Sequence, residues 1–242
     1  MRETFITNAG VVVPAVTEAE MREVDRIAIE ETGPNLFQMM ENAGRNLATL
    51  VIERLGAGWK SARVAVLAGT GGNGGGGLCA ARHLANRGVA VDVCLADPDG
   101  LGQVPAYQRH VLASTRAREV PRAQLGSPDV ILDAILGYSL AGAPRGAFAE
   151  LIEWANGAKA PILALDLPSG LDATSGEAPG GVIRARWTMT VALPKTGLRA
   201  AAVGELFLAD IGIPEGVYRR MQLSYEPPFE DRYCVPIRPK AS

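Results

Sequence analysis

The segment VAVLAGTGGNGGGGLCAARHL, residues 64–84, constrains the fold of this chain more than any other stretch. An apolar run opens it, residues 69–77 contain seven glycines, and a helix-like run follows. Each glycine loses more backbone entropy on folding than any other residue, so such a concentration is costly. We therefore expect this segment to form a loop whose backbone comes close to a bound ligand.

Short apolar runs alternate with helix-like segments along most of the chain, which is typical of an α/β fold with a mostly parallel sheet and helices on both faces. We expect one domain over residues 1–226, irregular in its first dozen residues, and an extended proline-rich tail over 227–242. Strands are expected at about 64–68, 91–95, 130–132, 162–165, 189–193 and 205–208, and helices after Thr17 and at about 35–55, 78–87, 105–114 and 147–156.

The composition is that of an ordinary globular protein, with 48% apolar and 21% charged residues. A net charge of −2 gives no basic field, so we expect no nucleic-acid partner. No apolar run is long enough to span a bilayer and no signal peptide is evident, which favours a cytoplasmic protein without membrane contact. Three cysteines without metal-ligand spacing favour unpaired thiols, with Cys79 and Cys94 buried as small apolar side chains.

Three unusual segments follow predicted parallel strands and should therefore meet at one edge of the sheet. They are the glycine segment, residues 133–142, and residues 166–172. Asp133 and Asp166 each end an apolar strand there. Oxygen ligands from Asn73, Asp133 and Ser169 are hard donors suited to an alkali or alkaline-earth cation.

Other motifs point to weaker alternatives. Residues 69–74 satisfy GxGxxG, and Asp97 follows the next strand, so an NAD-dependent oxidoreductase is one reading. Ser169 is not in a GxSxG nucleophile elbow. His83 and His110 fall on predicted helices and are more typical of surface or hydrogen-bonded side chains than of a catalytic base, so a Ser-His-Asp hydrolase is not favoured. Lys195 follows a strand and could meet an anion, although we expect it to be a solvated loop lysine.

With these segments in hand, the sequence resembles the NAD(P)HX epimerase family, the N-terminal domain type of the YjeF proteins, from about Thr17 to Pro214. The resemblance implies a Rossmann-like three-layer α/β/α sandwich, usually dimeric, that interconverts the R and S epimers of hydrated NADH and NADPH. A separate dehydratase then acts on the S epimer. The motifs that carry it are MENAG at 40–44, the glycine segment, DAILG at 133–137, LDLPSGLD at 165–172, PK at 194–195 and DIGIP at 210–214.

The resemblance also assigns residues. It implies one potassium ion per subunit and no redox cofactor. Asp166 is the best candidate for acid–base work, because the implied reaction needs proton transfer beside the nicotinamide ring. Asn73, Asp133 and Ser169 would bind the potassium ion. The substrate NAD(P)HX would be held by Gly72, Asn73, Gly74, Gly75 and Gly76, by Gly137, Tyr138, Ser139, Leu140, Ala141, Gly142 and Ala143, and by Asp166.

The chain departs from the family pattern in the glycine segment. The family sequence is GxGNNGGDG, whereas this chain has Gly72 in place of the first asparagine and Gly76 in place of the aspartate. Losing a hydrogen-bonding group typically costs about 1 kcal/mol of interaction free energy. The rival to an epimerase is therefore a non-catalytic ligand-binding or scaffold protein on the same fold, as in the related domain of mRNA-decapping enhancers.

Overall fold

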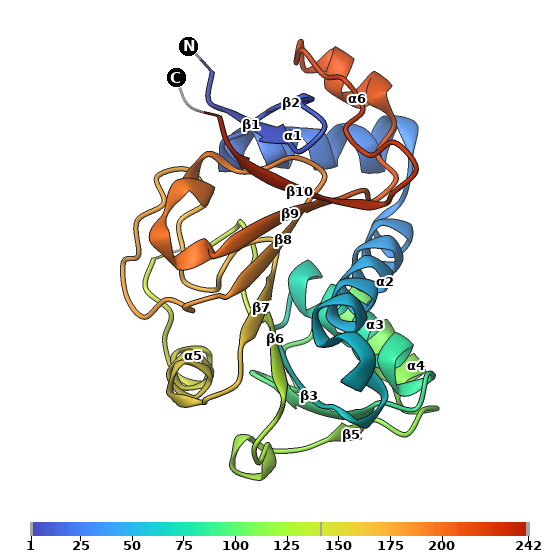
Figure 1. Ribbon diagram of the computed structural model, residues 1–242, viewed down its shortest axis with the longest axis vertical. Coiled ribbons are helices and arrows are strands. Elements are labelled where there is room, and N and C mark those ends of the chain that lie inside the picture. Colours follow the sequence, from blue (N-terminus) through green and yellow to red (C-terminus); the bar gives the residue numbers. More distant parts are fainter. Residues whose placement is uncertain (1, 141, 241–242) are drawn as a thin grey trace.

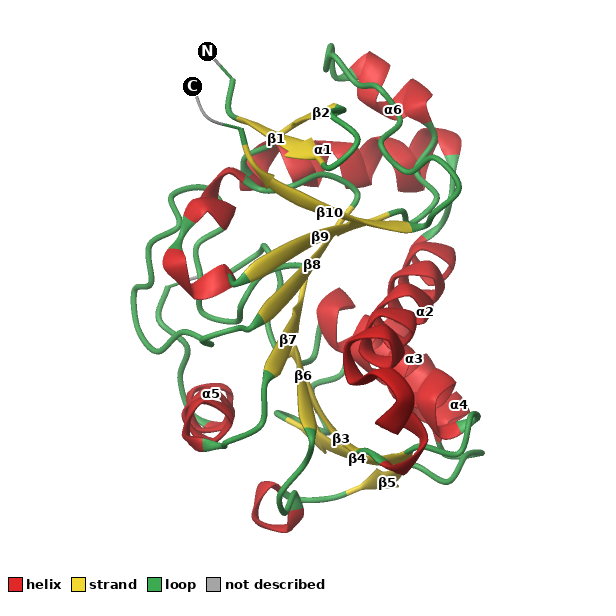
Figure 2. Cartoon of the chain, in the orientation of Figure 1, coloured by secondary structure: helices red, strands yellow, loops and turns green. Residues whose placement is uncertain are grey.

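A single ten-stranded sheet runs through the computed structural model, which describes residues 2–140 and 142–240 (Figures 1 and 2). Its strand order is β2-β1-β10-β9-β8-β7-β6-β3-β4-β5. The strands are β1 (Thr4–Thr7), β2 (Val12–Pro14), β3 (Arg63–Ala68), β4 (Ala90–Leu95), β5 (Arg118–Glu119), β6 (Val130–Ala134), β7 (Ile162–Leu165), β8 (Trp187–Val191), β9 (Glu205–Ala209) and β10 (Cys234–Pro239).

Helices cover both faces of this sheet. Figure 1 shows α2, α3 and α4 on one face and α5 on the other, with α1 and α6 near β1 and β2. The α-helices are α1 (Glu18–Ile27), α2 (Leu36–Leu55), α3 (Gly72–Ala85), α4 (Gln103–Leu112), α5 (Ala147–Gly157) and α6 (Glu215–Arg220). Shorter helical turns are η1 (Ala28–Thr32), η2 (Gly56–Ser61), η3 (Arg122–Gln124), η4 (Thr196–Arg199) and η5 (Ala201–Val203). The predicted α/β fold with a mostly parallel sheet is thus confirmed.

The strands from β5 to β9 pair in parallel, so their carboxyl ends meet at one edge. Apolar side chains on these strands fill three separate cores. One lies under α2 and α3, and another lies under α5. The third includes Leu206 and Leu208 of β9 and lies against α1 and α6. Because both faces are covered, the strands are near-continuous apolar runs, which made them recognisable in the sequence.

The ends of the chain correct two expectations. The first dozen residues are not irregular, because β1 and β2 pair in antiparallel fashion there. The segment 227–242 is not a tail outside the sheet, since β10 lies between β1 and β9 and pairs with both. The strands are short, and Pro236 and Pro239 interrupt the usual strand signal in β10, so periodicity alone did not reveal them.

The glycine segment is a helix rather than a loop. Helix α3 begins at Gly72, so the last five glycines of the segment lie in its first turns. A Cβ atom on Gly74 would lie 1.9 Å from the carbonyl oxygen of Gly69, and one on Gly77 would lie 2.5 Å from the Cβ of Ala134. The bare backbone therefore lets α3 lie directly against the β3 and β6 strand ends.

None of the helices in residues 2–140 and 142–240 is both long enough and apolar enough to cross a membrane.

Candidate active site

A cavity of about 520 Å³ opens at the carboxyl ends of β3, β6, β7 and β8. Helices α1 and α2 supply its other walls, with apolar side chains such as Met21, Met39 and Met40. The predicted site residues that line it are Gly72, Asn73, Gly137, Tyr138, Ser139 and Asp166. The sheet edge that topology indicated is therefore where the cavity lies.

Asp166 sits at the turn that ends β7, in the left-handed backbone region with φ of 68°. Aspartate tolerates this region better than bulky residues do, and such strained turns concentrate at functional sites. The turn directs the carboxylate, which is only 3% exposed, towards β8. There its Oδ1 forms an ion pair with Nζ of Lys195 and accepts a hydrogen bond of 3.1 Å from the Thr190 hydroxyl.

Lys195 is completely buried, so the expectation of a solvated loop lysine is wrong. Its ammonium also donates to the carbonyl oxygen of Val191 at 3.0 Å. The N-terminal segment covers it, because Val16 pairs with Lys195 in an isolated parallel bridge. A charge taken out of water needs a close partner of opposite sign, and Asp166 supplies it.

A second carboxyl group faces the same cavity from α1. Oδ2 of Asp25 accepts a hydrogen bond of 2.5 Å from the Tyr138 hydroxyl. Burial raises the pKa of Asp25 above its ordinary value, and the charge of Asp166 adds to this, while Tyr138, Lys195 and Arg22 oppose it. Burial and the nearby Asp25 charge also raise the pKa of Tyr138. Sequence reasoning missed Asp25, because an acid on the polar side of an amphipathic helix carries no signal of its own.

The three predicted cation ligands converge beside the cavity. Ser169 binds both oxygens of Asp133, with its hydroxyl donating to Oδ1 at 2.5 Å and its backbone N–H to Oδ2 at 2.8 Å. The Asn73 amide reaches the carbonyl oxygens of Leu136 at 2.9 Å and Leu165 at 3.0 Å. The Ser169 hydroxyl in turn accepts from the Leu136 N–H at 2.8 Å, which links the two groups.

Asp133 is fully buried. Burial raises its pKa to about 6, although hydrogen bonds from Ser169 and Ile135 lower it. The carboxylate of Asp133 and the hydroxyl of Ser169, with the carbonyl oxygens that the Asn73 amide nitrogen contacts, are oxygen donors of the kind that hard cations prefer.

The remaining predicted substrate residues lie away from the cavity surface. Gly74, Gly75 and Gly76 are buried inside α3, and the Cβ position of Gly76 faces Leu165 and Ala43. Leu140, Gly142 and Ala143 follow the cavity-lining part of their segment without lining the cavity. Ala141 lies outside the described residues.

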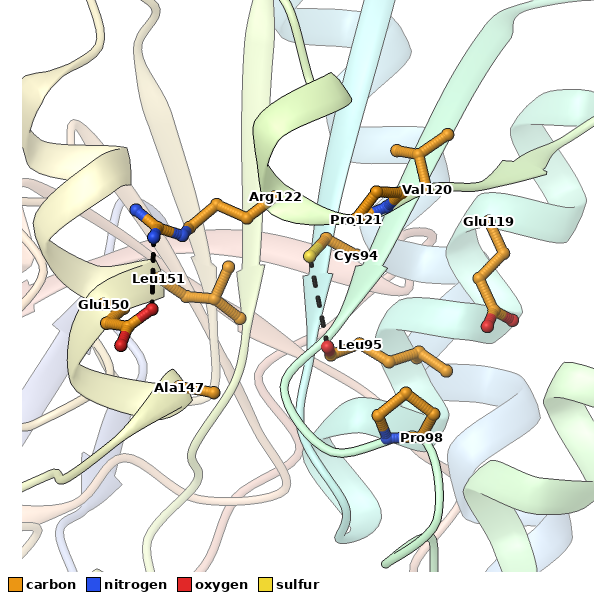
Figure 3. A pocket seen from close by; sticks show the side chains of 10 residues that line it. All are labelled: Cys94, Leu95, Pro98, Glu119, Val120, Pro121, Arg122, Ala147, Glu150 and Leu151. Carbon is orange, nitrogen blue, oxygen red and sulfur yellow. Dashed lines mark hydrogen bonds and ion pairs between the residues drawn. The ribbon is translucent and has the colours of Figure 1, made fainter.

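A separate cavity of about 370 Å³ lies near the end of β4, on the side of the sheet that α5 covers (Figure 3). Its Arg122 guanidinium pairs with Glu150 at 3.1 Å, and Cys94 is buried against it. Asp97, the acid of the dinucleotide fingerprint, instead caps a turn by accepting from the N–H groups of Asp99 and Gly100. This region therefore holds none of the residues that converge at the larger cavity.

Comparison with known proteins agrees with the fold. Residues 36–197 match the family model for the YjeF-related protein N-terminus. The chain is 53% identical to the NAD(P)H-hydrate epimerase of Dehalogenimonas lykanthroporepellens, over 96% of each chain. It is 38% identical to the bifunctional NAD(P)H-hydrate repair enzyme Nnr of Moorella thermoacetica, covering 83% of this chain and 41% of that protein.

The crystal structure of the yeast protein ynu0 has the same fold. Its TM-score is 0.75 at 24% identity, and the match covers 88% of this chain and 94% of the yeast chain. The family model spans most of the chain and includes the glycine segment, Asp133, Asp166, Ser169 and Lys195. The chain therefore belongs to the family of the YjeF-related protein N-terminus.

Proposed function

We propose that this protein is an NAD(P)H-hydrate epimerase that interconverts the R and S epimers of hydrated NADH and NADPH. The observation that carries the proposal is similarity along 96% of the chain to a relative named for that activity. The cavity supports it, because a helix N-terminus and the buried Asp166 line it at one sheet edge. The hydrogen-bonded pair of Asp133 and Ser169 lies beside it and contacts the cavity-lining Leu136.

The N-terminus of α3 is suited to the substrate's diphosphate. Gly71, Gly72 and Asn73 line the cavity where this 14-residue helix begins. The first backbone N–H groups of a helix have no partner within it, and the helix dipole favours an anion there. Gly72 in place of an asparagine removes one side chain from this wall but leaves the backbone donors in place.

Asp166 is positioned to act on the hydrated nicotinamide ring. The reacting carbon carries a hydroxyl next to a ring nitrogen, so changing its configuration requires either loss and return of the hydroxyl or opening and closing of the ring. Both routes need proton transfer close to the ring. A carboxylate buried beside the cavity can accept a proton and can stabilise positive charge that develops on the ring nitrogen.

A potassium ion at Asn73, Asp133 and Ser169 is part of the proposal. When bound, the ion would supply fixed positive charge near the substrate's phosphates. The residues themselves support this, since Asp133 and Ser169 present oxygen atoms that already meet through a hydrogen bond of 2.5 Å. In the same scheme, a separate dehydratase consumes the S epimer, in keeping with the bifunctional repair enzymes among the relatives. A homodimer in the cytoplasm stays a prediction.

The test is the rate of NADHX epimer interconversion, followed by chromatography with purified protein in potassium buffer. Acceleration over the spontaneous rate is the expected result. Folded protein that gives no acceleration would contradict the proposal and favour the non-catalytic binding protein. Incubation with NAD⁺ during thermal unfolding tests the oxidoreductase alternative, because a bound cofactor would raise the melting temperature.

A further inference from the structure

Two carboxyl groups line the cavity, and their partners differ in charge. Asp166 lies in an ion pair with the buried ammonium of Lys195. Asp25 instead contacts the neutral phenol of Tyr138 at 2.5 Å. The Tyr138 ring brings the two pairs together, since its centroid lies 5.8 Å from Nζ of Lys195. When two carboxyl groups in one site have such different environments, one is suited to accept a proton and the other to donate it.

The proposed reaction needs both roles. If the hydroxyl on the reacting carbon leaves, it must leave as water, so it takes a proton from the protein as the C–O bond breaks. The ring nitrogen's electron pair then forms an iminium ion. A water molecule that adds to the opposite face of that ion forms the new C–O bond and gives up a proton. An acid and a base are therefore used once each, and the substrate gains no net proton.

We propose that Tyr138 and Asp25 form the proton-donating half of the site, with Asp166 as the accepting half. When Asp25 is protonated, the short hydrogen bond between the two groups reverses, so that Asp25 donates to the Tyr138 oxygen and the hydroxyl hydrogen of Tyr138 turns to the substrate. Tyr138 then donates that proton to the leaving hydroxyl and takes the proton of the Asp25 carboxylic acid. Asp166 accepts the proton of the adding water. In the reverse direction the roles exchange, and proton transfer through water in the cavity resets the free enzyme. This inference rests on the proposed epimerase activity.

Asp25 is a positioning residue in this scheme, because it acts through Tyr138. The charged and titratable groups that face it are Tyr138 from the loop after β6, Asp166 and Lys195 from the loops after β7 and β8, Arg22 from its own helix, and Tyr218 from α6. Burial favours its protonated form, and the Arg22 guanidinium lies 5.8 Å from the Tyr138 ring rather than on the carboxyl group. The donating form of Asp25 is the protonated one, so turnover should fall as the pH rises through its pKa.

The test compares pH profiles of kcat for NADHX interconversion in the wild type, Asp25→Asn and Tyr138→Phe. Glu23→Gln is the matched control, since Glu23 also lies on α1 but pairs with Arg26 at 2.8 Å outside the cavity. We expect both site variants to lose about 10²-fold in kcat with a much smaller change in KM. Asp25→Asn should also lose the alkaline fall in kcat, which a merely structural effect would not remove. Glu23→Gln should match the wild type.

Two results would overturn the inference in distinguishable ways. If the wild type accelerates interconversion and either Asp25→Asn or Tyr138→Phe keeps its kcat and pH profile, only the proton-donating assignment is wrong. If the folded wild type gives no acceleration, the proposed function is wrong and the inference goes with it. Should Asp25→Asn fail to fold, Tyr138→Phe decides the matter alone, because it removes a single hydroxyl and leaves the ring in place.

Discussion

The molecule contains two clusters of partly or fully buried charged and polar side chains that look alike in composition but differ in how their charge is balanced. The pocket cluster is Asp25, Tyr138, Asp166 and Lys195. The helix cluster is Glu41 from α2 with Cys79, Arg82 and His83 from α3. In the helix cluster, the Arg82 guanidinium donates to Oε2 of Glu41 at 2.5 Å. Nε2 of His83 lies 2.9 Å from the other carboxylate oxygen, Oε1.

Both clusters hold an acid with a perturbed pKa, in opposite directions. Burial acts to raise the pKa of Glu41, but hydrogen bonds from Arg82, His83 and Cys79 outweigh it and lower the value to about 2. The pKa of Asp25 is raised, because burial there exceeds the opposing effects. The potential metal ligands Glu41, Cys79 and His83 lie within 4.8 Å of one another, yet Arg82 already supplies the positive charge. Burial of a charge alone therefore does not mark the candidate active site. It is marked by a buried acid beside a cavity whose neighbours do not fully stabilise its ionised form.

The largest expected effect is that of Asp166→Asn in the pocket cluster. Removing the proton acceptor should lower kcat/KM by about 10³-fold. The same change leaves Lys195 buried without its counter-ion and should lower the free energy of unfolding by about 3 kcal/mol. The double variant Asp166→Asn/Lys195→Met separates the loss of activity from the loss of stability. It removes the unpaired ammonium, so it should regain free energy of unfolding in urea without regaining kcat/KM. Recovery of activity in the double variant would contradict the assigned role.

The next effect concerns α3, which carries three residues of the helix cluster and begins at the cavity wall. Gly74→Ala places a Cβ atom against the backbone oxygen of Gly69, which cannot move away as a side chain can. We expect a loss of about 3 kcal/mol in the free energy of unfolding, measured with urea. The matched control is Gly72→Ala, whose Cβ would lie 3.6 Å from Sδ of Met40. It should change stability by less than about 1 kcal/mol, and equal losses for both variants would refute the packing explanation.

A third effect, expected to be slightly smaller, concerns the cation. Replacing choline by potassium at about 100 times the dissociation constant should stabilise the fold by about 2.7 kcal/mol. The stabilisation should fade as the pH falls through about 6, because protonated Asp133 cannot offset the ion's charge. Thermal unfolding in the two salts measures it, with Asp133→Asn as the control. Equal potassium stabilisation of wild type and Asp133→Asn would place the ion elsewhere.

The smallest effect is expected from Glu41→Gln in the helix cluster. The folded-state pKa of Glu41 is depressed, so its contribution is present above its unfolded value near 4.5 and is lost as the pH falls towards 2. Its side chain is 43% exposed, so solvent screening limits the contribution to less than about 1 kcal/mol. Urea unfolding measures this, because the free energy of unfolding should change less between pH 7 and pH 3 in Glu41→Gln than in the wild type. An unchanged pH dependence would show that Arg82 does not hold Glu41 as an ion.

Much of the fold could be predicted from local patterns. The capping box at Thr17 and the start of α2 at Asn35 are visible in the sequence, and both appear with side chain and backbone bonded reciprocally. Buried parallel strands such as β3 were found because apolar runs carry that signal. Helix α3 was shortened in the prediction because glycine has poor helix propensity. Tertiary packing overrides that propensity here, since only glycine allows the helix to approach β3 and β6 so closely.

The site residues that lie in sequence motifs could be predicted, whereas those brought in by distant segments could not. Asp133 and Ser169 are in hydrogen-bond contact, and Asn73 and Asp166 line the same cavity. Lys195 was missed because its burial depends on Val16 from the far end of the chain, which no local pattern reports. Asp25 was missed because the loop that carries Tyr138 reaches it only in the folded chain.

The most direct measurement is the initial rate of NADHX epimer interconversion by wild type, Asp166→Asn and Glu41→Gln, side by side in potassium buffer and with folding checked by circular dichroism. The account predicts acceleration by the wild type and by Glu41→Gln, and a rate close to the spontaneous one for Asp166→Asn. Equal rates for wild type and Asp166→Asn, or loss of activity in Glu41→Gln alone, would contradict it and move the chemistry away from the pocket cluster.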